Sequence, residues 1–343
     1  MRALISLLLL SIPLAAQDVE FTVRTRLVLV PVTVTDGKGR FVDGLDGSEF
    51  VVLDNGRPQR ATADTFGTGV APIALMVAVQ SSGISAPALA KVRRIGGMIQ
   101  VLVTGERGCS GLVSFDDRVR WLEDCTHDSE ALRRAYGALR PSQAAKKGRM
   151  LDAVYEATQR LAGRADVRRV LLVISESRDR GSETDVETVV LAAQSAGVTV
   201  YTATYSAFKT GLLTKPSDGP LLRPPEPGRA PDVTASRYPP TVPPEAQRLD
   251  ILGAFGELFR LGKVNAAEVL AGMTGGVAYS FARQRALEEA VQALGVELHS
   301  QYVLSFTPEL AEPGYHRLEV KITRPGTYTI RARPAYWATQ GGP

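Results

Sequence analysis

The three histidines and the adjacent carboxylates Asp116 and Asp117 are the candidates for catalysis that we consider first. His127, His299 and His316 lie in contexts typical of a loop, a helix end and a strand, and none has a nucleophile beside it in sequence. Asp116 and Asp117 lie between two short strand-like runs, which indicates a two-residue turn rather than a catalytic pair. The chain has no Gly-x-Ser-x-Gly, Walker-type or His-Glu-x-x-His motif. We therefore expect that the protein is not an enzyme.

The two cysteines flank this predicted turn and are expected to form a disulfide. Together with three histidines they are too few for a Cys- or His-rich zinc site or an iron–sulfur cluster, so any metal would need oxygen ligands. A hairpin centred on residue 117 places Cys109 opposite Cys125, within bridging distance. A strict two-residue turn shifts this register slightly, which a bulge could absorb; the alternative is two buried thiols. The facing pairs in the centred register are Phe115–Val119, Val113–Trp121, Gly111–Glu123 and Cys109–Cys125.

Length and composition indicate a globular protein of about two domains. The chain has 343 residues, of which 44% are hydrophobic and 22% charged. Forty basic residues against thirty-six acidic ones give a net charge of only +4, and the basic residues are scattered. We therefore expect no nucleic-acid partner.

The N-terminus has the pattern of a secretory signal peptide. A basic start at Met1-Arg2 precedes an apolar run over 3–14 and the small residues Ala15-Ala16. The run is shorter than the roughly 20 residues that span a bilayer, and no second such run follows. We expect cleavage after residue 16, no membrane span in the mature chain, and a secreted or periplasmic protein.

The two ends of the mature chain are predicted to be β-structure. Residues 17–70 and 300–343 show alternating apolar residues, such as Val28 to Val34 and Leu318 to Ile322, separated by Gly-containing turns. Each block is too small to bury a stable core alone. We expect the two ends to pair in one β-sandwich.

The middle of the chain, residues 71–299, alternates strands with helices. This order predicts an α/β domain with a doubly wound, mostly parallel, Rossmann-like sheet and an antiparallel pair over 110–124 at its edge. The predicted strands cover 71–80, 168–175, 198–205 and 277–281, and the predicted helices cover 86–104, 129–139, 150–161, 186–196, 249–261, 266–273 and 283–298.

A proline-rich segment interrupts this pattern. Residues 209–247 carry ten of the twenty-one prolines, so they can be neither helix nor central strand. A ligand for a partner domain is one interpretation; a tolerated, exposed insertion is the favoured one.

Four parts of the sequence are similar to those of a known family. The parts are LVLVPVTVTDGKGRFVDGLDGSEFVVLDNGRPQ from residue 27, IALMVAVQSSG from residue 73, RRVLLVISESRDRGS from residue 168, and HSQYVLSFTPE, HRLEVKITRPG and ARPAYWA towards the end. They resemble von Willebrand factor A-like (VWFA-like) proteins, in particular the secreted, acidobacterial-type VWFA-related family. The resemblance implies an A-domain of Rossmann-like topology flanked by β segments, used for binding other molecules rather than for turnover.

The resemblance also implies positions for a metal-ion-dependent adhesion site, and the sequence departs from its pattern. That pattern is Asp-x-Ser-x-Ser after the first strand, a Thr in a later loop and an Asp after a central strand. Gln80 stands at the first Asp, Ser82 matches the first Ser, and Ile84 replaces the second Ser; Gly148 stands near the Thr position and Glu176 at the last Asp. Mg²⁺ prefers six oxygen ligands in octahedral array. We therefore expect a degenerate site and no cofactor.

Three further oxygen-bearing residues could replace missing ligands. Ser81 and Ser85 could serve by a shift of register, and Asp179 follows three residues after Glu176. The favoured interpretation is local: Ser81 belongs to a turn and Ser85 caps the next helix.

Two classes of function remain. The first is a secreted, non-enzymatic binding or adhesion protein with a protein or glycan ligand. The second is a divalent-metal-dependent receptor, or an accessory subunit of an extracytoplasmic enzyme complex, in which residual ligands still recruit Mg²⁺.

Overall fold

The computed structural model describes residues 27–64, 71–82, 86–142, 147–205, 265–281, 284–308 and 313–338. The predicted signal peptide, the proline-rich segment and the helix predicted at 249–261 lie outside these residues. Within the described residues, no helix is both long and apolar enough to cross a membrane.

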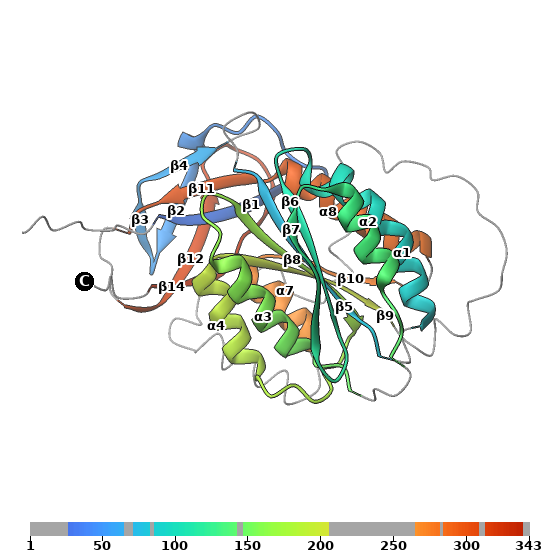
Figure 1. The fold of residues 1–343 in the computed structure, drawn as a ribbon. Coiled ribbons are helices and arrows are strands. Elements are labelled where there is room, and N and C mark those ends of the chain that lie inside the picture. The colour runs from blue at the N-terminus through green and yellow to red at the C-terminus, as the bar shows by residue number, and fades with distance from the viewer. Residues whose placement is uncertain are drawn as a thin grey trace, which may run out of the picture.

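A six-stranded sheet with the order β10-β9-β8-β5-β6-β7 forms the centre of the fold (Figure 1). Neighbouring strands are parallel except at one edge, where β7 runs antiparallel to β6. The α/β fold predicted from the sequence, with its mostly parallel sheet and antiparallel edge, is confirmed. The strands are β5 (Ile73–Gln80), β6 (Cys109–Phe115), β7 (Val119–Thr126), β8 (Arg168–Glu176), β9 (Val198–Tyr205) and β10 (Ala278–Phe281).

Helices cover both faces of this sheet (Figure 1). Every residue of β5 is buried; Leu75 and Val77 face the core beneath α1, α2 and α8, while Met76 and Ala78 face the core beneath α3, α4 and α7. A central strand covered on both faces must be apolar throughout, which explains its unbroken hydrophobic run. The helices are α1 (Ala86–Ile99, continued by a π-helical segment at Gln100–Thr104), α2 (Ser129–Ala138), α3 (Met150–Ala162), α4 (Val186–Ala196), α7 (Ala266–Thr274) and α8 (Gln284–Ser300).

The capping residues of α4 explain why that helix begins and ends where it does. The Asp185 carboxylate accepts a hydrogen bond from the Thr188 backbone N–H at 2.8 Å. Gly197 ends the helix with φ +65°, a left-handed conformation that favours glycine.

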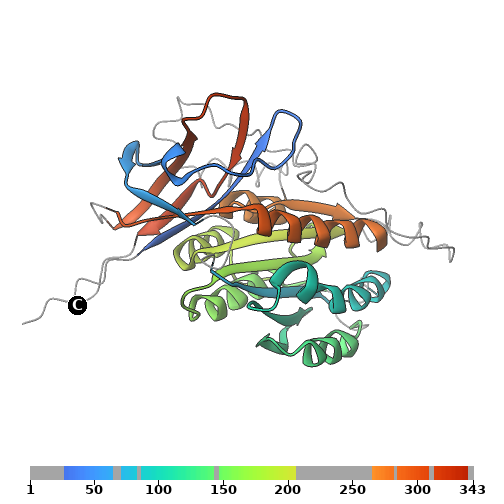
Figure 2. The same cartoon turned by 90° about the horizontal axis from the view of Figure 1, so that it is seen from above.

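The two ends of the chain pair in two four-stranded antiparallel sheets (Figure 2). One has the order β13-β1-β11-β4 and the other β14-β12-β2-β3, so both contain N-terminal and C-terminal strands. Val32 and Tyr302 of the first sheet and Val52 and Leu318 of the second belong to one apolar core. The strands are β1 (Val28–Asp36), β2 (Phe50–Asp54), β3 (Arg57–Gln59), β4 (Ala61–Asp64), β11 (Tyr302–Phe306), β12 (Gly314–Ile322), β13 (Tyr328–Arg331) and β14 (Ala335–Ala338), with a short 3-10 helix at Gly47–Glu49 before β2.

A buried polar cluster joins these sheets to the α/β part. Glu297 of α8, fully buried, accepts hydrogen bonds from Tyr201 at 2.7 Å and Gln301 at 3.3 Å. Its Oε1 also lies 2.6 Å from Nη2 of Arg331 on β13. Burial raises the pKa of Tyr201, and the nearby Glu297 carboxylate raises it further, so the phenol stays a donor. The ion pair between Arg331 and Glu297 therefore links the antiparallel sheets to the α/β part of the molecule.

The predicted disulfide between Cys109 and Cys125 is confirmed, with a Cα–Cα distance of 5.2 Å. The register predicted for it is correct only near the turn. Phe115 faces Val119 and Val113 faces Trp121, but Leu112 rather than Gly111 faces Glu123. Register shifts on both sides of Leu112 displace the strands, so the cysteines are not directly opposed.

The turn itself is also longer than predicted. It spans residues 116–118, closed by a hydrogen bond of 3.1 Å from the Asp116 N–H to the Arg118 carbonyl. Gly111 accommodates the bulge, because a Cβ there would lie 2.7 Å from the Met76 methyl group and 3.0 Å from the Asp124 carbonyl carbon.

Candidate functional site

The candidate site lies at the carboxyl ends of β5 and β8, which are neighbours at the centre of the sheet. The connection after β5 runs through α1 on one face, whereas α3 and α4, on either side of β8 in sequence, cover the other face. In open α/β sheets, such a switch point leaves a crevice at the strand ends, where ligands bind. Gln80 and Glu176 are the last residues of the two strands.

The Gln80 side chain bridges this switch point. Its Oε1 accepts a hydrogen bond of 2.9 Å from the backbone N–H of Glu176, and its Nε2 donates one of 2.6 Å to Oγ of Ser82. Gly148 lies against the same amide, because a Cβ at that position would be 2.7 Å from Nε2. The structure thus brings together four of the five positions named from the sequence; Ile84 lies outside the described residues.

Glu176 provides a carboxylate at the switch point between β5 and β8. Its side chain is only 11% exposed, and Oε2 has no hydrogen-bond partner among the described residues. Among the described residues, the nearest cation is Nε of Arg180, 4.0 Å from Oε2.

The three further oxygen-bearing candidates lie in different environments. Ser81 is 1% exposed, and its backbone N–H and its hydroxyl both donate to the Phe115 carbonyl, at 2.7 and 3.2 Å. Asp179 accepts hydrogen bonds from the Leu151 N–H and from Ser182. Ser85 lies outside the described residues.

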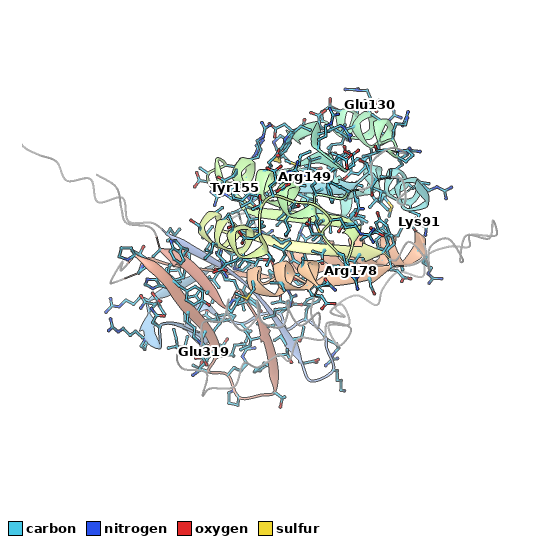
Figure 3. The ribbon with its side chains drawn as sticks, turned by 90° about the horizontal axis from the view of Figure 1, so that it is seen from below. Lys91, Glu130, Arg149, Tyr155, Arg178 and Glu319 are labelled. Carbon is cyan, nitrogen blue, oxygen red and sulfur yellow. A yellow bond between two sulfur atoms is a disulfide. The ribbon has the colours of Figure 1, made fainter. Side chains whose placement is uncertain are left out.

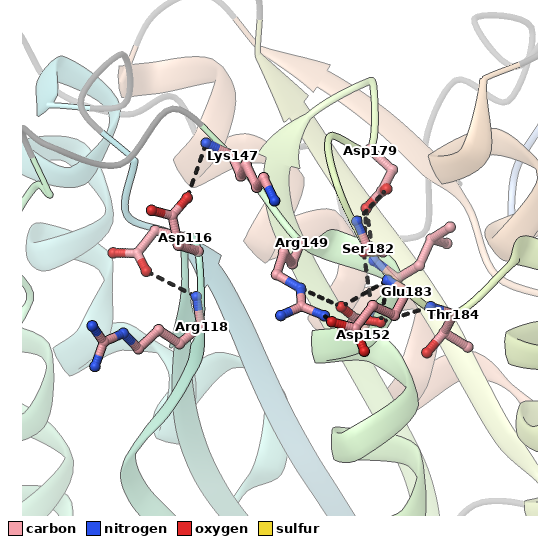
Figure 4. Close-up of polar contacts among 11 residues, drawn as sticks. Asp116, Arg118, Lys147, Arg149, Asp152, Asp179, Ser182, Glu183 and Thr184 are labelled. Carbon is pink, nitrogen blue, oxygen red and sulfur yellow. Dashed lines mark hydrogen bonds and ion pairs between the residues drawn. The ribbon is translucent and has the colours of Figure 1, made fainter.

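Asp179 belongs to a set of contacts that docks the loop after β8 on the start of α3 (Figure 4). Oδ1 of Asp179 accepts from the Leu151 N–H at 3.0 Å, and Oγ of Ser182 accepts from the Asp152 N–H at 3.2 Å. In return, the Asp152 carboxylate accepts from the backbone N–H groups of Glu183 and Thr184. We call Asp152, Asp179 and Ser182 the loop clasp.

The carboxylate of Asp152 is kept ionised by this clasp. Burial alone would raise the pKa of Asp152, but the hydrogen bonds from Thr184 and Glu183 and the contact with Arg149 outweigh it and leave the pKa below its ordinary value. Nε of Arg149 lies 2.6 Å from Oδ2 of Asp152.

Asp152 and Ser182 are not among the site residues predicted from the sequence, although the sequence holds one indication that the start of α3 needs such contacts. Arg149 occupies the N-cap position of α3 and makes no side-chain cap. A helix start with no Ser, Thr, Asp or Asn leaves backbone N–H groups that other parts of the chain must satisfy. The start of α3 therefore requires acceptors from elsewhere, which the loop after β8 provides.

The donor set at the switch point does not fit Mg²⁺, the metal that the resemblance implies. The Ser82 hydroxyl accepts a hydrogen bond from the Gln80 amide, and Glu176 is the one carboxylate at the bridge. No group of three or more His, Cys, Asp or Glu residues in the described part of the chain could hold a metal ion. Mg²⁺ needs six oxygen ligands, but the N–H of the Gln80 amide, which cannot bind a cation, occupies this position.

Three loops meet around the bridge, and their exposed cations form what we call the basic rim. The Arg149 N–H donates to the Asp116 carbonyl at 3.0 Å, and Gly148 and Arg180 exchange two backbone hydrogen bonds of 3.1 Å. These contacts join the loops at 116–118, 147–149 and 177–184. The basic rim consists of Arg118, Lys147, Arg178 and Arg180, all exposed.

The three histidines are dispersed over the molecule. The carbonyl of His127, beyond β7, accepts from Gln100. His299 lines a cavity of about 440 Å³ at the opposite, amino-terminal edge of the sheet, where burial and the nearby Arg168 lower its pKa. His316 is buried in the sandwich, with Nδ1 2.8 Å from Oδ1 of Asp54. No two of them share a site.

No protein-family model matches the sequence, and no curated protein matches it. Among solved structures, a von Willebrand factor type A protein from Catenulispora acidiphila is 7% identical over 94% of this chain and 76% of its own, with a TM-score of 0.45. An aerotolerance-related membrane protein from Bacteroides fragilis is 14% identical over 65% of this chain and 98% of its own, with a TM-score of 0.41. BatB from Bacteroides thetaiotaomicron is 18% identical over 39% of this chain and 66% of its own, with a TM-score of 0.34.

These similarities add no argument of their own about function. The strand order and the antiparallel edge of the six-stranded sheet carry the fold assignment, and they agree with the topology that the sequence resemblance implies. The part of the chain around the six-stranded sheet therefore has the α/β topology expected of a von Willebrand factor A-like fold.

Proposed function

We propose that this protein is a secreted, non-enzymatic binding or adhesion protein that engages a protein or glycan ligand at the carboxyl edge of its six-stranded sheet. The Gln80 bridge is the observation that carries the proposal. It holds the two strands of the switch point together with an amide, in the position where the resemblance implies a metal-binding aspartate. Binding at this edge therefore needs no divalent cation.

The location and the domain organisation are parts of the same proposal. The Cys109–Cys125 disulfide supports a secreted or periplasmic protein, because such bridges persist in oxidising compartments. We assign residues 17–70 and 300–343 to one sandwich domain, residues 71–299 to the A-like domain, and residues 209–247 to an insertion in it.

One observation favours the second class, a metal-dependent receptor or accessory subunit. Oε2 of Glu176 is buried without a hydrogen-bond partner among the described residues, and the Ser82 hydroxyl lies at the same bridge. If the Gln80 amide turned away, these two oxygens could become metal ligands.

Calorimetry with millimolar Mg²⁺ and Mn²⁺, paired with thermal melting, separates the two classes. We expect flat titrations and an unchanged melting temperature. Saturable binding of one ion that disappears in Glu176→Ala would overturn the proposal in favour of the second class. Glu289→Gln, which changes an exposed carboxylate on α8, is the control for a general loss of negative charge.

A capture experiment tests the binding function. The protein is incubated with the extracytoplasmic fraction of its source cells, with EDTA in one arm and Mg²⁺ in the other. We expect the same partner in both arms. A partner that is retained only with Mg²⁺ would contradict metal-free binding.

A further inference from the structure

Three carboxylates of the carboxyl edge, those of Asp116, Asp152 and Asp179, are directed into the protein. Asp116 is fully buried, 2.6 Å from Nη2 of Arg120, and it accepts a backbone hydrogen bond from Arg118. Asp152 and Asp179 are used by the loop clasp. Their negative charge is thereby neutralised by N–H groups and guanidinium groups inside the protein.

The cations of the same loops are directed outward. Arg118, Lys147 and Arg178 are exposed, and their side chains make no ion pair with another described residue. The Arg180 side chain has, in the described part of the chain, only the distant contact of 4.0 Å with Glu176. The edge carries nearly equal numbers of both charges, but the charge that it presents to a ligand is mainly positive.

The loops that carry these cations are tied to one another by local contacts. The aliphatic part of Lys147 packs over Gly181, since a Cβ on Gly181 would lie 2.8 Å from Cδ of Lys147. The Lys147 N–H donates to Oδ1 of Asp117 at 3.2 Å, which ties the loop of Lys147 to the loop of Arg118. The three loops that carry these cations are therefore linked to one another beside the switch point.

We propose that the basic rim, formed by Arg118, Lys147, Arg178 and Arg180, binds carboxylates of an acidic protein segment without a metal ion. This proposal rests on the proposed function and names the chemistry of its ligand. Guanidinium groups bind carboxylates through paired, charge-assisted hydrogen bonds, and unpaired surface cations attract acidic partners.

Two exposed carboxylates near the basic rim favour an acidic polypeptide over an evenly charged polysaccharide as the ligand. Asp117 lies beside Arg118, and Glu183 belongs to the loop of Arg178 and Arg180; its side chain is 86% exposed, with one oxygen 2.7 Å from Nη2 of Arg149. They would repel an evenly charged polyanion such as a uronate polysaccharide. A polypeptide can place its Asp or Glu side chains opposite the cations and neutral or basic residues opposite these two carboxylates.

The test measures binding of a labelled oligoglutamate peptide to the purified protein in EDTA, with an oligoglutamine peptide as the neutral probe. We expect saturable binding of the acidic peptide alone, unchanged by added Mg²⁺ and weaker at about 0.5 M than at about 0.05 M NaCl because salt screens exposed charges. The Arg178→Gln/Arg180→Gln variant should raise the Kd by about tenfold or more.

A matched variant removes the same charge elsewhere. The variant Arg57→Gln/Arg60→Gln changes two exposed arginines in the part of the molecule formed by the two small antiparallel sheets. Figure 3 marks that part by Glu319 and shows Arg178 away from it, at the six-stranded sheet. Its Kd should stay within about twofold of the unaltered protein. An equal loss in this variant would show that only net charge matters and would overturn the proposal, as would a failure of the acidic peptide to bind.

A third probe, polygalacturonate, tests the class of ligand. Tighter binding of this polysaccharide than of the peptide, lost in Arg178→Gln/Arg180→Gln, would overturn the choice of a protein partner. The proposed metal-free function is judged separately by the Mg²⁺ and Mn²⁺ titrations: saturable metal binding there overturns it, whereas flat titrations with no peptide binding overturn only the present inference.

Discussion

Gln80 and Glu176 end adjacent central strands, and the side-chain oxygen of the first accepts the backbone N–H of the second at 2.9 Å. The two residues are 96 positions apart in the chain. With the second hydrogen bond, to Ser82, the amide satisfies polar groups from both strand ends in a buried place. This bridge holds the two strand ends of the switch point in a fixed arrangement.

Gly148→Ala should destabilise the protein by about 1–3 kcal/mol, because the new methyl group displaces the Gln80 amide and breaks its hydrogen bonds. Gln80→Ala should cost a similar amount. The double variant should cost clearly less than the two single losses together, since the clash disappears with the amide. Urea unfolding of the four proteins measures this coupling, and strict additivity would show that the contact is absent.

Glu297→Gln should cost about 3 kcal/mol, because it removes the counterion of the Arg331 guanidinium, whose side chain is only 22% exposed. Glu289→Gln on the same helix should cost less than about 1 kcal/mol, since its pair with Arg285 is more than half exposed on both sides. Thermal and urea unfolding of both variants provide the comparison. Equal losses would mean that the buried pair does not hold the two halves of the molecule together.

Intact mass after alkylation under denaturing, non-reducing conditions should show no adduct on protein purified from an oxidising compartment. Two adducts should appear after reduction. Replacing both cysteines with Ser should lower stability by about 3 kcal/mol in the chain-entropy model, because the bridge closes a loop across 16 positions. Adducts before reduction would show free thiols.

Asp152 should make stability depend on pH in the acid range. Its pKa is lower in the folded protein than the ordinary value of 3.8. The unfolded chain therefore binds a proton first, so the stabilisation is complete above about 3.8 and is lost as the pH falls through the lower, folded-state pKa.

Unfolding measured across this window should show a shallower acid loss for Asp152→Asn than for the unaltered protein. Asp166→Asn, an exposed substitution in the loop before β8, controls for the removal of one acidic residue. Identical acid slopes for Asp152→Asn and the unaltered protein would contradict a role for the clasp carboxylate in acid stability.

The sequence by itself determined the elements and the fold class. The unbroken apolar run of β5 requires a strand covered on both faces, and the alternation of strands with helices requires a mostly parallel sheet. These signals are local, because each follows from the spacing of neighbouring side chains. The cysteine pair on either side of a turn was sufficient, for the same reason, to predict the disulfide.

The tertiary structure alone decided how the edge of the sheet is built. No local pattern shows that Gln80 reaches Glu176, that Gly148 leaves room for the amide, or that the loop after β8 caps α3. The shifts beside Leu112 likewise depend on how β7 packs at Gly111. Each of these contacts joins residues that are distant in sequence, so its geometry is fixed by the packing of whole elements rather than by the preferences of any one segment.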